Sequence, residues 1–206
     1  MEPRWLTWAR EIQAIGQTGL AFTQDVYDRE RYERLRDIAA HMMADEAGAD
    51  PAFVEGLFAG ETGYATPKID VRGAVFMEGK ILLVQERADA GRWTLPGGWA
   101  DVNRSPSEAV IAEVREEAGL DVRPVKLAAL YDRTHHPHPP LPFHIYKLFF
   151  LCEITGGIPA PGTETAGVDF FGRDALPELS TSRVLASQIA RMFAHHESPD
   201  LPTEFD

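Results

Sequence analysis

The spacing of apolar residues changes near Lys68, and this change restricts the fold that the chain can adopt. Before it, apolar residues recur three and four positions apart, as on one face of a helix, at Trp5, Trp8, Ile12 and Ile15. After it, apolar and charged residues alternate through residues 69–73, which is the period of a strand. The chain therefore divides into an all-helical N-terminal domain, residues 1–66, and a mixed domain, residues 67–206. The expected fold class is α+β.

The pattern also places individual elements. In the first domain we expect one helix interrupted at Gly16 and Gly19, a second over residues 24–47, and a third from the cap Asp50-Pro51 to near Gly60. In the second domain we expect strands over residues 69–76, 81–84, 126–131, 144–153 and 168–171, and a last helix over residues 182–195.

Composition excludes several classes of partner. The formal net charge of −12 over 206 residues argues against nucleic-acid binding, because neutralising phosphates needs many Lys and Arg. A single cysteine, Cys152, allows no intrachain disulfide and fits a reducing compartment. The start of the chain does not have the pattern of a signal peptide, and no apolar run approaches the roughly 18 residues that cross a bilayer. We therefore expect a cytoplasmic protein with no membrane partner.

The strongest helix signal lies within residues 95–120. Residues 105–108, Ser-Pro-Ser-Glu, form a capping box with Pro at the first helical position, and Gly119 suits a left-handed C-terminal residue. Three glutamates at i, i+3 and i+4 share a face of this helix: Glu113, Glu116 and Glu117. Such carboxylates repel one another, and a divalent cation would turn the repulsion into binding. A solvated acidic helix face is the alternative.

This segment resembles the box of the Nudix (MutT-like) hydrolase family. That box is a Gly, five residues, Glu, seven residues, and then Arg-Glu-aliphatic-x-Glu-Glu-x-Gly-aliphatic. The positions that fit are Gly98, Glu113, Val114, Glu116, Glu117, Gly119 and Leu120. Two positions depart from it: Arg104 stands in place of the first Glu, and Ala112 in place of the Arg. We hypothesise that Arg104 fills the space of the absent arginine and supports a helix carboxylate.

The N-terminal helices resemble those of a Nudix subgroup with ADP-ribose pyrophosphatases and a CDP-choline pyrophosphatase. The resemblance implies a Nudix α/β/α sandwich with a small all-helical N-terminal domain. It also implies a pyrophosphohydrolase with Mg²⁺ or Mn²⁺ that cleaves a nucleoside diphosphate linked to another moiety. In that case the metal ligands would be the carbonyl of Gly98 with Glu113, Glu116 and Glu117. The general base would be Glu113 or, alternatively, Glu164, which otherwise is a solvated loop residue.

Four further residues are candidates for substrate binding. Arg87 and Arg133 are expected at strand ends and could clamp a phosphate, although either could be a surface arginine. Trp99 could stack on a base or pack in the core. His144 ends a loop of histidines and prolines, residues 135–144, which could grip the second organic group of a substrate. Zinc binding by this loop is the alternative, but no Cys or i, i+4 His pair supports it.

Three functions remain open at this point. The first is the pyrophosphohydrolase, and the second is a catalytically silent nucleotide-binding or regulatory protein, which the two departures from the box would allow. The third, an RNA-processing nuclease, is opposed by the acidic balance. A homodimer is expected because the helical domain offers more apolar surface than it can bury, at Trp5, Trp8, Leu35 and Met42.

Overall fold

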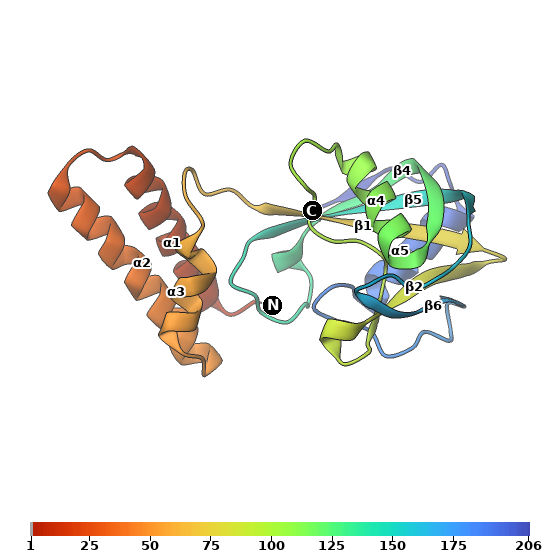
Figure 1. The fold of residues 1–206 in the computed structure, drawn as a ribbon, viewed down its shortest axis with the longest axis horizontal. Helices are drawn as coiled ribbons and strands as arrows, with labels where there is room; N and C mark the ends of the chain where they lie inside the picture. The colour runs from red at the N-terminus through yellow and green to blue at the C-terminus, as the bar shows by residue number, and fades with distance from the viewer. Residues whose placement is uncertain (1) are drawn as a thin grey trace. The chain divides into compact units, whose positions relative to one another are not determined.

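The computed structural model describes residues 2–206, and the fold is α+β, as expected (Figure 1). The chain separates into two compact units. One unit contains the chain up to Lys68 together with Pro140–His144, and the other contains Ile69–Pro139 with Ile145–Asp206. Among the described residues, no helix is both long and apolar enough to span a membrane.

The helical unit contains α1 (Arg4–Phe22), α2 (Val26–Ala47) and α3 (Pro51–Ala59). Asp25 caps α2 by accepting from the backbone N–H groups of Tyr27 and Asp28, and Asp50 caps α3 by accepting from that of Ala52. The three helices bury a small apolar core of Leu6, Ala9, Ala40, Met43, Ala44, Val54 and Phe58.

The predicted interruption of the first helix at Gly16 and Gly19 is wrong, because α1 continues through both glycines. A Cβ atom on Gly16 would lie 2.9 Å from the carbonyl oxygen of Tyr32, and one on Gly19 would lie 2.4 Å from the Tyr32 ring. Both glycines therefore let α1 approach α2 closely. This packing outweighs the roughly 1 kcal/mol by which Gly is less favourable than Ala in a helix.

The segment Pro140–His144 packs on the helices rather than with the rest of its loop. Arg10 donates to the carbonyl oxygen of Leu141 at 3.1 Å, and the ring of Phe143 meets that of Phe58 edge-on, with centroids 5.5 Å apart. The backbone N–H of Lys68 donates to His144 at 2.9 Å. The sequence analysis placed this whole segment in the second domain, whereas these contacts join it to the helical unit.

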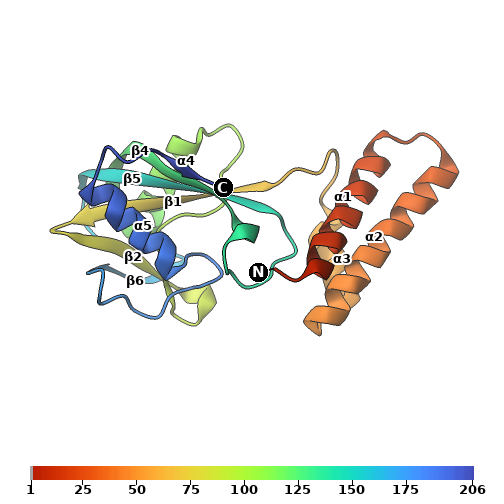
Figure 2. The ribbon, with the colours of Figure 1, turned by 180° about the vertical axis from the view of Figure 1, so that it is seen from behind.

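The mixed unit is a sheet with one helix on each face (Figures 1 and 2). In the described residues the sheet has seven strands in the order β3-β2-β1-β5-β4-β7, with β6 paired to β2. The strands are β1 (Lys68–Met77), β2 (Lys80–Glu86), β3 (Trp93–Thr94), β4 (Leu120–Asp132), β5 (Ile145–Gly157), β6 (Thr165–Phe171) and β7 (Glu204–Phe205). The two helices are α4 (Pro106–Ala118) and α5 (Ala186–Glu197).

Two apolar clusters fill the spaces between the sheet and its helices. Val71 and Val75 of β1 pack with Val110 and Val114 of α4. On the other face, Ala74 of β1 packs in the cluster that contains Ile189 and Met192 of α5. Because successive strand residues point to opposite faces, Asp70 and Arg72 lie on the α5 face with Ala74. Both are buried, so the charged side of this strand is not a solvent face.

Three strand segments were not predicted from the sequence: the two-residue strand β3, the first part of β4, and β7. The strand β4 starts at Leu120, six residues before the predicted start, and its pairing with β5 shifts register between Asp121 and Val122 and again between Pro124 and Lys126. Each bulge breaks the period of two that identifies a strand. The strand β7 is two residues long and pairs in parallel with Ala129 and Leu130 of β4.

Candidate functional site

The helix α4 carries the three predicted glutamates and forms as its sequence indicates. The hydroxyl of Ser105 accepts from the backbone N–H of Glu108, and the Glu108 carboxylate accepts from that of Ser105 at 2.8 Å. Gly119 ends the helix at φ 71°. A Cβ atom on Gly73 would lie 2.7 Å from a methyl of Val114, so α4 lies directly against β1. This contact fixes the height of the glutamates above the strand.

The three glutamates lie in different surroundings. Glu117 is buried, Glu113 is half-buried and Glu116 is exposed. The backbone N–H of Gly97 donates to the Glu117 carboxylate at 2.8 Å. A Cβ atom on Gly98 would lie 3.0 Å from a carboxylate oxygen of Glu113. The glycine pair that precedes α4 in the chain therefore faces two of the glutamates.

The backbone of the loop Leu95–Gly98 is fixed against β1. The N–H of Val71 donates to the carbonyl of Gly98, and that of Gly73 donates to Pro96, both at 2.9 Å. Gly97 has φ 145°, and a Cβ atom there would lie 2.0 Å from the carbonyl oxygen of Val71. A side chain at this position would disrupt both the pairing and the N–H that reaches Glu117.

Burial makes two of the glutamates hard to ionise without a cation. It raises the pKa of Glu113 to about 7, with Glu116, Asp101 and Asp70 acting in the same direction and Arg72 against it. Burial also raises the pKa of Glu117 to about 7, although the Gly97 N–H and Arg72 lower it. Across residues 2–206, no three His, Cys, Asp or Glu side chains already form a metal-binding group. A cation bound here would therefore take its remaining ligands from water or from substrate phosphates.

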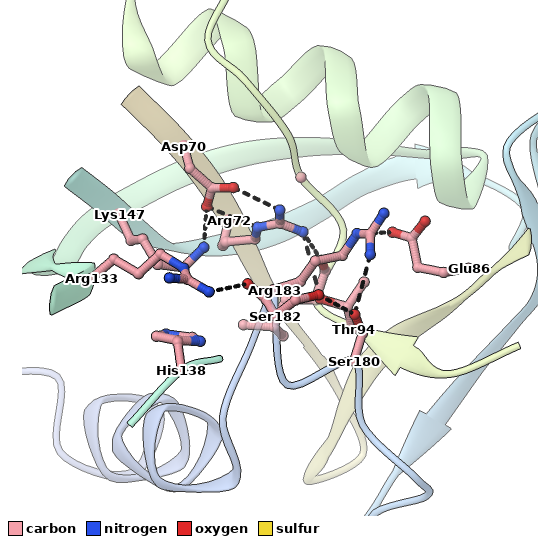
Figure 3. Close-up of polar contacts among 12 residues, drawn as sticks. Asp70, Arg72, Glu86, Thr94, Arg133, His138, Lys147, Ser180, Ser182 and Arg183 are labelled. Atoms are coloured by element: carbon pink, nitrogen blue, oxygen red, sulfur yellow. Dashed lines mark hydrogen bonds and ion pairs between the residues drawn. The ribbon is translucent and has the colours of Figure 1, made fainter. Parts of the chain in front are cut away.

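A buried group of charges lies on the α5 face of the sheet and contacts the loop Leu95–Gly98 (Figure 3). Arg72 donates to both carboxylate oxygens of Asp70, at 2.9 and 2.7 Å, and Lys147 donates to the same carboxylate at 2.6 Å. Burial works against ionisation of Asp70, yet the two cations lower its pKa to about 2. Arg72 also donates to the carbonyl oxygen of Leu95 at 3.1 Å. It thus joins the charge group to the loop that holds Glu117.

The structure does not support the hypothesis that Arg104 fills the space of the absent arginine beside Glu113 and Glu117. The carboxylate of α4 on which it acts is Glu108 in the first turn, whose pKa is lowered by hydrogen bonds from Ser105 and by the charge of Arg104. The Arg104 guanidinium is 3.5 Å from the carboxylate of Asp101, in the loop before the helix, and its side chain is 44% exposed. The cation that acts on both Glu113 and Glu117 is instead Arg72.

The loop that carries Glu164 packs against the C-terminal turn of α4. Thr165 donates its hydroxyl to the carbonyl of Glu117 at 2.9 Å, and a Cβ atom on Gly162 would lie 1.9 Å from the carbonyl oxygen of Glu116. Glu164 itself is exposed, and its carbonyl accepts from the backbone N–H of Arg87 at 3.2 Å. The exposed Arg87 donates its Nε to the carbonyl of Thr165 at 2.9 Å. The fold therefore brings Arg87 and Glu164 together beside α4.

The other three predicted residues lie in different places. Arg133 is buried, and it donates to the carbonyl oxygens of Pro139 at 2.6 Å and Ser182 at 3.4 Å. Trp99 is 50% exposed, next to the glycine pair, and its backbone bridges to Asp70. His144 belongs to the helical unit.

The buried charges and the N–H donor of Gly97 were not predicted from the sequence. The alternation over residues 69–73 predicted a strand, but not the burial of Asp70 and Arg72. A signal was present, because Ala74 and Phe76 continue the same face of β1 with apolar residues. Lys147 interrupts the apolar run of residues 145–152, which is a second indication of a buried ion pair.

Two family models match the chain. Residues 3–58 match the model of the UDP-X-like, N-terminal oligomerisation domain, and residues 67–192 match that of the NUDIX domain. The protein YjhB of Bacillus subtilis (strain 168), whose name provisionally assigns it ADP-ribose pyrophosphatase activity, is 48% identical over 206 residues. This match covers 100% of the present chain and 99% of YjhB.

Two solved structures extend the likeness. An ADP-ribose pyrophosphatase from Streptococcus suis 89-1591 is 42% identical with a TM-score of 0.62, over 68% of this chain and 100% of that one. A UDP-X diphosphatase is 31% identical with a TM-score of 0.63, over 98% of each chain. The predicted family and sandwich fold are confirmed: the chain belongs to the Nudix hydrolase family and carries the UDP-X-like N-terminal domain.

Proposed function

We propose that this Nudix hydrolase cleaves the diphosphate of a nucleoside diphosphate conjugate, of the ADP-ribose or CDP-choline type, with a bound divalent cation. The products would be a nucleoside monophosphate and a phosphorylated partner. The observation that carries the proposal is the placement of Glu113 and Glu117 beside the glycine pair Gly97-Gly98. The names of YjhB and of the Streptococcus suis enzyme support ADP-ribose. CDP-choline rests on the resemblance of the N-terminal helices.

The residues of the site fit Mg²⁺ or Mn²⁺. Glu113, Glu116 and Glu117 offer carboxylate oxygens, and Gly98, whose carbonyl would be a further ligand, lies beside Glu113. Mg²⁺ typically binds one or two carboxylates and completes its shell with water and substrate phosphates. A site with few protein ligands is therefore suited to Mg²⁺. Burial also disfavours the ionised form of Glu113 and Glu117, whose pKa values are about 7, and a bound cation would stabilise that ionised form.

We assign roles to the chain's own residues as follows. A bound cation would neutralise charge on the diphosphate and lower the pKa of the water that it binds. Glu117, held by the Gly97 N–H, is a metal ligand, and Glu113 is a ligand or the general base, for which a pKa near pH 7 is suited. Glu164 is the alternative base on its exposed loop. The exposed Arg87 beside it would clamp a phosphate, and the half-exposed Trp99 would stack on a base.

Replacing one metal ligand tests the site. In Glu117→Gln we expect kcat with ADP-ribose and Mg²⁺ to fall by roughly 100-fold or more, because a ligand of the cation is lost. The matched control is Glu153→Gln, which makes the same change at an exposed carboxylate paired with Arg123. The control should keep its activity. Equal activity in the two variants would remove Glu117 from the metal site.

The raised pKa of Glu117 predicts a pH-dependent stability. The folded state holds this proton to about pH 7, against an ordinary 4.5, so the carboxyl contributes stability at low pH that is lost as the pH rises through 7. Glu117→Gln cannot lose a proton. We expect the free energy of unfolding of the variant, minus that of wild type, to increase by about 1–3 kcal/mol between pH ~5 and ~8 in EDTA. Urea unfolding measures this, and a difference independent of pH would contradict it.

Substrate preference follows from charge. A triphosphate brings more negative charge to a chain of net charge −12, while a diphosphate conjugate needs less compensation. We expect kcat/KM at fixed Mg²⁺ to be higher for ADP-ribose or CDP-choline than for ATP or CTP. If a triphosphate is better by about tenfold, roughly 1.4 kcal/mol of transition-state preference, the charge argument fails.

We further propose a homodimer through the helical unit. Of the residues named from the sequence, Trp5 and Met42 pack on the helical core, while Trp8 remains 49% exposed. With Ile15 and Phe22, at 50% and 70% exposure, Trp8 forms a stripe along α1 with a spacing of seven residues. The match to an oligomerisation domain supports this interface.

Sedimentation should therefore give twice the mass of the chain at micromolar concentration. Ile15→Asp should yield a monomer, because it places a charge in the centre of the stripe. Val102→Asp, at an 88% exposed position in the other unit, should leave the mass unchanged. A wild-type monomer would contradict the proposal.

A further inference from the structure

We propose that Arg72 is a positioning residue for Glu117 of α4. From β1 it holds the loop Leu95–Gly98 so that the Gly97 N–H meets the Glu117 carboxylate. This inference rests on the proposed function of Glu117.

The guanidinium of Arg72 is held from two sides. Two of its nitrogens bind the two oxygens of Asp70 in a fork, and Nη1 donates to the carbonyl of Leu95 at 3.1 Å. Figure 3 shows Arg72 between Asp70 and Thr94, on the strand that passes beneath α4. Arg72 is 3% exposed, so this side chain has little freedom to leave. The Leu95 carbonyl is therefore fixed relative to β1.

The fixed carbonyl lies two residues before the N–H that binds Glu117. Pro96 stands between them and accepts from the backbone N–H of Gly73. Gly97 follows at φ 145°, against the backbone of β1, where a Cβ atom would lie 2.9 Å from the Cα of Arg72. Leu95 is thus held by a side chain and the next residues by backbone contacts. Loss of the Arg72 bond would release one end of this short loop.

The helix has no equivalent support of its own. Position 112 is Ala, and Arg104 turns to Asp101. The loop before α4 is instead fixed from β1, through the hydrogen bond that Arg72 donates to the Leu95 carbonyl.

Lys147 provides a matched control. It is 1% exposed and donates to the same carboxylate, Asp70, at 2.6 Å. Lys147→Met leaves the Arg72–Asp70 pair, and Arg72→Met leaves the Lys147–Asp70 pair, so each variant removes one buried cation and keeps one ion pair. Arg72 alone of these two cations donates to the Leu95 carbonyl.

The first measurement needs no metal and no substrate. In protein labelled with ¹⁵N-glycine and kept in EDTA, the Gly97 amide resonance is identified as the one that Glu117→Gln shifts most. We expect Arg72→Met to shift this resonance and to speed its hydrogen exchange by at least tenfold. In Lys147→Met, both should stay at their wild-type values.

The second measurement is steady-state kinetics with ADP-ribose and Mg²⁺. We expect Arg72→Met to lower kcat by about 50-fold or more with KM changed less than threefold, and Lys147→Met to stay within threefold of wild type in both. Arg72→Lys keeps the charge but not the fork, so it should restore kcat only in part. It also serves as the test if Arg72→Met does not fold.

The outcomes separate the two proposals. A Gly97 amide unchanged in Arg72→Met, or in Arg72→Lys if only that variant folds, overturns the positioning role whatever the kinetics show. Equal kinetic losses in Arg72→Met and Lys147→Met would also overturn it, because a general loss of buried charge would then explain both. A wild-type protein without Mg²⁺-dependent hydrolysis would defeat the proposed function, while the amide measurement would still decide whether Arg72 holds the loop.

Discussion

The contact between Gly97 and the backbone of β1 is the constraint on which the site depends. A side chain at Gly97 would overlap the carbonyl oxygen of Val71, so the loop can lie this close only as glycine. The closeness turns the Gly97 N–H toward Glu117 and leaves Gly98 facing Glu113. The helix α4 can then present buried carboxylates without leaving them fully unpaired, since a buried charge without partners is costly. Strand, loop and helix meet at one glycine.

The buried charges of the mixed unit lie close to this loop, because Arg72 donates to the Leu95 carbonyl. Asp70 lies between two cations, Arg72 and Lys147, so the three side chains together carry one excess positive charge. Arg72 is the cation that acts on Glu113 and Glu117. A protein with net charge −12 thus keeps a positive charge that acts on the buried Glu117 and the half-buried Glu113. Net charge is a guide to partners and solubility, and local charge decides the chemistry.

The features that could be predicted from the sequence were mostly those that depend on neighbouring residues. The capping box at Ser105–Glu108 and the left-handed Gly119 depend on neighbouring residues only, so the helix and its three-glutamate face could be predicted. The alternation in β1 correctly predicted a strand, but the burial of Asp70 and Arg72 depends on partners that are distant in the sequence, Leu95 and Lys147. The interruption predicted at Gly16 and Gly19 was wrong for the same reason: these glycines allow α2, which is distant from them in the sequence pattern, to pack closely against α1. The register shifts of β4 hid its first half from any periodic analysis.

An arginine on the strand β1 differs from an arginine on the surface of α4 in the free energy needed to order its side chain. A long arginine on an exposed helix face keeps much of its rotamer freedom, and fixing it during the reaction costs free energy. Arg72 is ordered when the protein folds, because Asp70 and the Leu95 carbonyl hold it in a buried position. Groups that are fixed in advance need no reorganisation when charge develops at the site. The absence of an arginine at position 112 is therefore compatible with an active site, provided that the sheet beneath the helix supplies the charge.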